Sequence, residues 1–357
     1  MSLDSYLTLG RSGLRISPLT LGTMTFGEDW GWGTSPDESA QILAHYLDLG
    51  GNSIDTANIY TNGHSEKIIG DYFAGRPDLR DGVVIGTKFF GNLHTGNPNG
   101  GGAGRKAIVQ QLEASLRRLQ TDYVDIYWIH NWDEGTPVSE TLRTLDDLVS
   151  AGKIRYVGIS DFPSWKAAEA QTIADFRGWA PAAAMQLEYS LIERTVEGEL
   201  IPMAQAYGMG VMPWSPLRRG LLSGKYTRAN ASGTRSDGAP GPNERELAII
   251  EVLNDVAADA GVTPAVAALA WVQSRPSVTS TIVGARNAQQ FDANIAALDV
   301  TLADKQLVAL DEASTPTLSF PFDNNRALAA MLQFAGATVD GRPSIAAPHL
   351  LSAPDRY

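Results

Sequence analysis

The chain has 357 residues with a net charge of −12 and no cysteine, a length that fits either two domains or one large barrel. The acidic balance argues against a nucleic acid or an anionic membrane surface as the main partner. The absence of cysteine excludes disulfides, thiolate nucleophiles and cysteine-ligated metals, and with no secretion signal or membrane-length apolar stretch we expect a reducing, cytoplasmic location.

Short apolar, β-branched runs alternate with longer helix-patterned segments along the chain. In chain order, strands are predicted at residues 18–21, 52–55, 83–87, 124–129, 154–159, 182–186, 210–213 and 279–283. Helices are predicted at residues 36–49, 65–73, 105–119, 138–150, 164–176, 196–207, 263–274 and 288–297. This pattern predicts an α/β fold, a single (β/α)8 TIM barrel over residues 1–312, with residues 313–357 as a C-terminal extension that packs on the barrel. A doubly wound sheet is the alternative, but no G-x-G-x-x-G motif follows the first strand.

Glycine-rich segments interrupt the alternation after several strands, at residues 27–35, 91–104 and 223–243. Barrel enzymes keep their functional loops at the carboxyl ends of the strands. The last segment, rich in Gly, Ser, Asn and Pro, is interpreted as a lid that orders over a bound cofactor.

Ionisable residues stand at the ends of three consecutive predicted strands. Asp55 ends the second strand, Lys88 follows the third and His130 follows the fourth, while Tyr60 lies five residues after Asp55. Taken singly, each has an ordinary explanation as a cap, a solvated cation, a hydrogen-bonded core histidine or a rim residue. Packing does not require all of them together, however, and in a barrel they converge on one mouth.

These four residue types form a coherent chemical set. An ammonium at Lys88 would lower the pKa of the Tyr60 phenol, and Asp55 would keep the lysine charged. His130 could donate a hydrogen bond to a substrate oxygen. Such a set suits proton donation to a carbonyl group that accepts a hydride. It does not suit hydrolysis, because no activated nucleophile or metal-bound water is evident.

The sequence resembles the aldo-keto reductases from about Leu7 to about Glu312. The segments IDTANIYTNGHSEKIIG, VVIGTK and SLRRLQTDYVDIYWIH carry the Asp, Tyr, Lys and His of that family. Further similar segments are GKIRYVGISDF, MQLEYS, WSPLRRGLLSGKY and IVGARNAQQFDAN. The resemblance implies that Tyr60 is the general acid in reduction and the general base in oxidation. It also implies that Lys88 lowers the pKa of Tyr60, that Asp55 pairs with Lys88, and that His130 positions the carbonyl.

The resemblance further implies a nicotinamide dinucleotide as cofactor. It places the nicotinamide carboxamide on Ser160, Asp161 and Gln186, and the nicotinamide ring on Trp214. It assigns the loop over the pyrophosphate to Ser215, Pro216, Leu217, Gly220, Gly224 and Lys225. It assigns the adenosine and its 2′-phosphate to Gly284, Ala285, Arg286, Gln290 and Asn294. Near the first strand's end it adds Gly22, Thr23 and Met24, with Asp55 beside the cofactor.

Three positions depart from the usual family pattern. Asp161 stands where Asn is common, Trp214 where Tyr or Phe is frequent, and Arg218 where a small residue is usual. A planar guanidinium at Arg286, next to a helix predicted to begin near Asn287, suits a phosphate monoester. We therefore expect NADP(H) as the cofactor, without excluding NAD(H).

Aromatic residues near the strand ends predict a pocket for an apolar substrate or a sugar face. The predicted pocket consists of Phe26, Trp30, Trp32, Tyr60, Phe89 and Trp132, with Phe90 and Trp128 nearby. The expected partner is a small aldehyde, ketone or sugar-derived carbonyl, with no nucleic acid, membrane or metal. Two alternatives stay open: a cofactor-binding regulatory subunit without turnover, and a metal-dependent barrel hydrolase, although no His-x-His follows the first strand.

Overall fold

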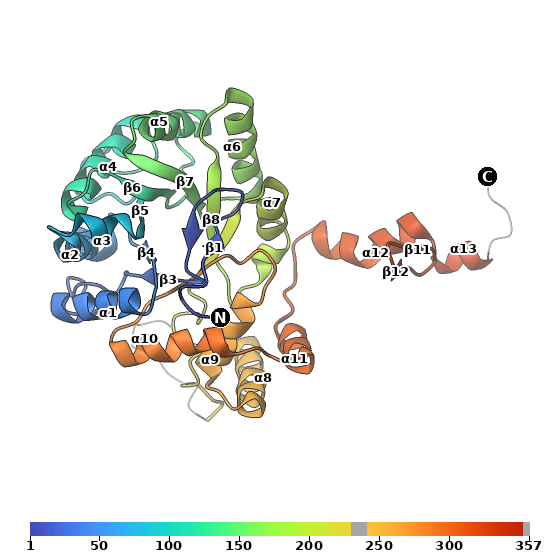
Figure 1. Cartoon of the computed structure of the whole chain (residues 1–357). Helices are drawn as coiled ribbons and strands as arrows, with labels where there is room; N and C mark the ends of the chain where they lie inside the picture. The colour runs from blue at the N-terminus through green and yellow to red at the C-terminus, as the bar shows by residue number, and fades with distance from the viewer. Residues whose placement is uncertain (230–240, 353–357) are drawn as a thin grey trace. The chain divides into compact units, whose positions relative to one another are not determined.

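The computed structural model describes residues 1–229 and 241–352 (Figure 1). The chain divides into two compact units, Met1–Ser314 and Thr315–Tyr357, close to the boundary predicted at residues 312 and 313. Residues 230–240, the centre of the predicted lid, lie outside the described part.

The first unit contains an eight-stranded parallel sheet in the order β10-β3-β4-β5-β6-β7-β8-β9. Its strands are β3 Leu19–Gly22, β4 Ser53–Asp55, β5 Val84–Phe89, β6 Val124–Ile129, β7 Ile154–Ser160, β8 Ala182–Glu188, β9 Gly210–Trp214 and β10 Thr281–Val283. Val211 in β9 pairs in parallel with Val278, just before β10, so the sheet nearly closes on itself. The predicted (β/α)8 barrel is confirmed.

Helices surround the strands, as Figure 1 shows. In this unit they are α1 Pro36–Asp48, α2 His64–Phe73, α3 Pro77–Asp81, α4 Arg105–Leu119, α5 Val138–Ser150, α6 Ser164–Arg177, α7 Leu200–Tyr207, α8 Glu244–Ala260, α9 Pro264–Gln273, α10 Ala288–Ile295 and α11 Asp304–Ser314. No single helix among the described residues is long and apolar enough to cross a membrane, and α8 with α9 passes that test only as a pair bent by 94°.

Two hydrophobic clusters follow from the two-residue period of the strands. The larger cluster lies between strands and helices and includes Ile85, Tyr127, Ile129 and Ile159. The smaller one fills the barrel and consists of Leu9, Ile16, Val84, Ile126, Trp128, Ala184, Met212 and Ile282. Along β5, β6, β8 and β9 its members alternate with members of the larger cluster, so every second residue of a strand faces the inside of the barrel. The inward-facing residues beyond this cluster, toward the carboxyl ends of the strands, therefore point into the barrel's mouth.

Trp128 sits inside the barrel because two neighbouring strands carry glycine opposite it. A Cβ at Gly86 would lie 2.7 Å from the Trp128 Nε1 atom, and one at Gly158 would lie 2.1 Å from its ring. Any side chain at either position would therefore displace the indole. A short hairpin, β1 Leu7–Thr8 with β2 Arg15–Ile16, contributes Leu9 and Ile16 to the cluster below it.

Several helices were not predicted from the pattern. Helix α8 begins with a capping box in which Asn243 and Glu246 bond each other's backbone, but Asn243 was included in the glycine-rich segment. Helix α11 was also missed. The second unit contains α12 Phe322–Phe334, the hairpin β11 Thr338–Val339 with β12 Arg342–Pro343, and α13 Pro348–Ser352, none of which was predicted.

Candidate active site

The barrel brings the four predicted catalytic side chains together at the carboxyl ends of its strands. Asp55 is the last residue of β4, Lys88 lies near the end of β5, and His130 follows β6 directly. All three side chains point into the barrel, because their sequence neighbours Ile54, Phe89 and Ile129 belong to the larger cluster, on the opposite face of the strands. Tyr60 begins the 3-10 turn η1 Tyr60–Gly63 that connects β4 to α2.

Lys88 is the centre of this group and is 1% exposed. Its Nζ donates to Asp55 Oδ2, to the Thr56 carbonyl oxygen at 2.9 Å and to the Tyr60 hydroxyl at 3.1 Å. Gln186 holds the other Asp55 oxygen with a hydrogen bond of 2.6 Å from its Nε2. The rings of Tyr60 and His130 meet edge to face, with centroids 5.9 Å apart.

The charges of the buried group are coupled. Burial lowers the pKa of Lys88, but the Asp55 carboxylate and the Tyr60 hydroxyl outweigh it, so the net direction is upward and the lysine stays charged. Burial raises the pKa of Asp55, and Lys88 opposes that rise. Burial also raises the pKa of Tyr60, and the lowering by Lys88 is smaller. The expected lowering therefore exists, but in the free protein the loss of hydration exceeds it.

His130 is neutral at physiological pH. Burial, assisted by the nearby Lys88 ammonium, lowers its pKa to about 3. A neutral imidazole keeps one N–H donor and one acceptor nitrogen. It can therefore donate a hydrogen bond to a carbonyl oxygen without adding a second positive charge beside Lys88.

The backbone turn that carries Tyr60 is held in an uncommon conformation. Thr61 and Asn62 have φ values of 46° and 60°, and Gly63 has 93°. The Thr61 hydroxyl donates to the Phe26 carbonyl oxygen at 2.7 Å and accepts from the Ser65 amide at 3.0 Å. These bonds offset the strain and fix the position of the phenol.

The predicted nicotinamide residues lie at the same mouth. Ser160 ends β7, Gln186 lies in β8 and Trp214 ends β9, each on the inward face. Asp161 follows Ser160 with φ 52°, and its Oδ1 accepts a hydrogen bond of 3.1 Å from Trp214 Nε1. In this structure Gln186 bonds Asp55.

The predicted pyrophosphate loop follows β9 and contains left-handed residues. Ser215, Arg218 and Arg219 have φ values of 53°, 48° and 51°. The predicted loop residues Pro216, Leu217, Gly220, Gly224 and Lys225 lie in the same segment. Arg218 donates to Glu188 Oε1 at the end of β8, a pair that was not expected.

The predicted adenosine segment links β10 to α10. Arg286 is exposed, and its amide donates to Gln290 Oε1 at 2.9 Å. Asn287 caps α10 through a bond of 2.8 Å from the Gln290 amide, and Asn294 donates to the Gly284 carbonyl oxygen at 3.3 Å. Two of the predicted contacts, Gln290 and Asn294, thus shape this loop themselves. Of the remaining predicted residues, Ala285 is buried beside Gly284, and Gly22, Thr23 and Met24 lie across from it at the end of β3.

Comparison with known proteins identifies the chain. A model described as the aldo/keto reductase family matches residues 18–315. The chain belongs to the aldo/keto reductase family. This confirms the resemblance found in its sequence. The membership supports an oxidoreductase that reduces carbonyl groups of small molecules.

Three relatives of this aldo/keto reductase carry different descriptions. An uncharacterised oxidoreductase of Bacillus subtilis, YrpG, is 38% identical over 85% of this chain and 94% of its own length. An aryl-alcohol dehydrogenase of Pestalotiopsis microspora is 36% identical, over 86% of this chain and 81% of its own length. A probable voltage-gated potassium channel subunit beta of Oryza sativa is also 36% identical, over 83% of this chain and 91% of its own length.

The aromatic residues of this aldo/keto reductase separate into core and rim. Phe26, Phe89 and Trp128 are fully buried in the two hydrophobic clusters, so we leave them out of the proposed pocket. Trp30 and Trp32 contact each other with ring centroids 5.5 Å apart. Trp132, two residues after His130, meets Trp165 edge to face at 5.9 Å.

Trp165 and Glu188 were not predicted as site residues. Trp165 lies five residues after the end of β7, at the start of α6, and is 59% exposed. Its place after a strand end was the signal that could have indicated it. Glu188 ends β8, where its acidic side chain faces the mouth beside Arg218.

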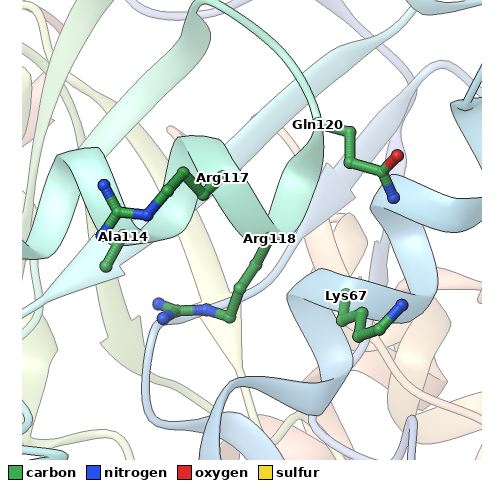
Figure 2. A pocket seen from close by; sticks show the side chains of 5 residues that line it. All are labelled: Lys67, Ala114, Arg117, Arg118 and Gln120. Carbon is green, nitrogen blue, oxygen red and sulfur yellow. The ribbon is translucent and has the colours of Figure 1, made fainter.

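A hollow of about 280 Å³ on this aldo/keto reductase lies elsewhere, between α2 and α4 (Figure 2). It is lined by Lys67, Ala114, Arg117, Arg118 and Gln120. Lys67 is paired with Asp71 and Arg118 with Glu66, so most of the positive charge that lines the hollow is already balanced. Among the described residues, no group of three or more His, Asp or Glu side chains could hold a metal ion.

Proposed function

We propose that the chain is an NADP(H)-dependent carbonyl reductase or alcohol dehydrogenase. It transfers a hydride between NADP(H) and the carbonyl or alcohol carbon of an aldehyde, a ketone or a sugar-derived substrate, with Tyr60 as general acid and base. The observation that carries the proposal is the 3.1 Å contact between the buried Lys88 ammonium and the Tyr60 hydroxyl, beside a neutral His130. A reducing, cytoplasmic location is part of the proposal, because the chain lacks cysteine.

In the proposed reduction, each residue of the site has a separate role. When bound, NADPH supplies the hydride that the carbonyl carbon accepts. His130 donates an N–H to the carbonyl oxygen and orients it between the imidazole and the phenol. Tyr60 then transfers its hydroxyl proton to that oxygen, and the Lys88 ammonium stabilises the phenolate left behind. Asp55, held by Gln186, keeps Lys88 charged and in place.

The direction of the Tyr60 pKa favours reduction at neutral pH. A phenol whose pKa is raised by burial stays protonated, and the protonated form is the one that reduction consumes. Oxidation of an alcohol requires the phenolate, so its rate should increase as the pH rises toward the pKa of the phenol.

Residues around the mouth suit a dinucleotide. Trp214 is half-buried and ends β9 at the same mouth as the four predicted catalytic side chains, so its exposed surface can stack on a flat ring. The left-handed residues Ser215, Arg218, Arg219 and Gly220 curve the chain after β9. The amides of Arg218, Arg219 and Gly220 donate within this loop, so we expect the loop's side chains rather than these amides to contact the pyrophosphate. Arg286 is exposed one residue before Asn287, the cap of α10, where the positive end of a helix favours a phosphate.

Replacing Arg286 with alanine should weaken NADPH binding much more than NADH binding, because only NADPH carries the 2′-phosphate. A hydrogen-bonded charge pair of this kind contributes roughly 1.5–3 kcal/mol, which corresponds to an increase of about 10- to 150-fold in the Kd for NADPH. Isothermal titration calorimetry with both nucleotides measures the difference. Arg117→Ala, which removes an exposed arginine from α4, is the matched control. Equal weakening of both nucleotides would assign Arg286 to the structure of the loop instead.

The contact between the half-buried Trp132 and the exposed Trp165 favours aromatic substrates with an extended ring system. Alanine at either position should raise the KM for 2-naphthaldehyde about 2- to 10-fold, the range expected from losing one aromatic contact, and leave the KM for acetaldehyde unchanged. The control is Phe176→Ala, since Phe176 lies at the far end of α6 and is 83% exposed. The same rise for both aldehydes would mean that the pair supports the loop rather than the substrate. The relative described as an aryl-alcohol dehydrogenase agrees with this choice of substrate class.

The direct test of the proposed function is consumption of NADPH, followed by absorbance, with a panel of aromatic aldehydes, ketones and sugar-derived carbonyls. Turnover of at least one class is expected. A second candidate is a regulatory subunit that binds the nucleotide without turnover, as the similarity to a potassium channel subunit beta suggests. Tight NADPH binding in calorimetry together with no turnover on any member of the panel would favour that candidate.

A further inference from the structure

Asp161 and Trp214, two of the positions where this chain departs from the usual family pattern, contact each other. Trp214 Nε1 donates to Asp161 Oδ1 at 3.1 Å. The bond crosses β8, because Asp161 follows β7 and Trp214 ends β9. The Asp161 backbone is fixed in turn, since its amide donates to the Gln186 carbonyl oxygen at 3.3 Å.

We propose that Asp161 is a positioning residue that holds the plane of the Trp214 indole in the free enzyme, so that the nicotinamide meets a pre-oriented ring. The inference rests on the proposed function, because it assumes that Trp214 stacks on the nicotinamide. It assigns to Asp161 a role beyond contact with the carboxamide, and it couples the two side chains energetically.

The chemistry of the two side chains explains why they occur together. An indole N–H can only donate, and it needs an acceptor where the ring is half-buried, whereas phenylalanine has no such need. A carboxylate accepts through both oxygens, so either rotamer satisfies the indole, while an amide presents its own N–H₂ in one of its two orientations. An ionised carboxylate accepts about four hydrogen bonds. Trp214 and Ser160 provide two, which leaves capacity for an amide N–H of the ligand.

The surrounding charges make this contact sensitive to acid. Asp161 is exposed as a residue, but the protein around its carboxyl removes part of the hydration and raises its pKa to about 6, against the lowering by Trp214 and Ser160. Glu188 on β8 adds to the rise, Lys88 on β5 opposes it, and Arg218 neutralises Glu188. Below that pH the carboxyl gains a proton, loses its charge and accepts more weakly. The Trp214 platform should then be less well held.

The test compares four proteins: wild type, Asp161→Asn, Trp214→Phe and the double variant, with Trp179→Phe as a control for loss of a tryptophan. Calorimetry gives the Kd for NADPH at about pH 7.5 and about pH 5, on either side of the carboxyl pKa. Each of the changes Asp161→Asn and Trp214→Phe should raise the Kd for NADPH at the higher pH about 2- to 10-fold. The Kd of the double variant should not exceed the larger of the two single-variant Kd values. Protonation of the 2′-phosphate of NADPH also weakens binding in this pH range, so the pH comparison is repeated with NADH, which lacks that phosphate. The wild-type Kd for NADH should rise on acidification by a similar factor, and Asp161→Asn should abolish that rise.

A second readout needs no ligand. Near-ultraviolet circular dichroism of the free proteins should show the same reduction of the indole band in Asp161→Asn and Trp214→Phe, because an unrestrained ring contributes little. Additive losses of affinity, an unchanged pH dependence in Asp161→Asn, or an indole band that Asp161→Asn leaves intact would each overturn the inference. If no variant binds NADPH or NADH, the proposed function fails, and the dichroism alone decides whether Asp161 holds the indole.

Discussion

Replacing Tyr60 with phenylalanine should lower kcat for carbonyl reduction by about 10²- to 10⁴-fold, the usual contribution of a positioned general acid. The change removes the hydroxyl that lies 3.1 Å from Lys88 Nζ and leaves the ring in contact with His130. Because almost no surface is lost, the Kd for NADPH should stay within about twofold of wild type. Steady-state kinetics and calorimetry on the same preparation separate the two effects.

The matched control removes a phenol hydroxyl elsewhere. In Tyr123→Phe the lost hydroxyl donates to Asp81, outside the mouth, and both kcat and Kd should be those of wild type. The wild-type enzyme should also oxidise alcohols faster as the pH rises toward the raised pKa of Tyr60, and Tyr60→Phe should lose that dependence. A loss of NADPH binding that matches the loss of turnover would contradict the assignment of Tyr60 as the acid.

The elements that carry the site were predictable because their signals are local. A strand that alternates inner and outer positions places Lys88 and Asp55 in the mouth whenever the barrel closes, and the sequence already contains that alternation in VIGTKF. The relation of Asp161 to Trp214 was not predictable, since 53 residues separate them and only the sheet order brings them together. The same holds for Arg218, whose partner Glu188 ends the neighbouring strand.

The aromatic pocket shows where spacing alone was insufficient. Phe26 and Phe89 stand near the ends of predicted strands, but both are buried in the larger cluster. For Phe89 the reason is that one residue along a strand turns a side chain to the other face, so it packs against Tyr127 while Lys88 faces the mouth. Trp165 was overlooked because it lies inside a helix-patterned segment. Its first-turn position still places it at the rim, which periodicity within the helix does not reveal.

Replacing Lys88 with methionine should reduce both stability and turnover, because it leaves the Asp55 carboxylate buried without its cation. Removing one partner of a buried ion pair costs about 3–5 kcal/mol of the free energy of unfolding. Urea-induced unfolding of the free protein measures that loss. Turnover should fall as well, since the phenolate formed at Tyr60 loses the ammonium that stabilises it.

The double variant Asp55→Asn/Lys88→Met separates the structural from the chemical role of the pair. With no charge left to bury, and with an amide that can still bond Gln186, the double variant should recover at least half of the stability lost in Lys88→Met. It should recover none of the turnover, because a stable packing at this position does not replace a positive charge 3.1 Å from the phenol. A Lys88→Met protein as stable as wild type, or a double variant that regains turnover, would show that the charge of this pair is not what the chemistry uses.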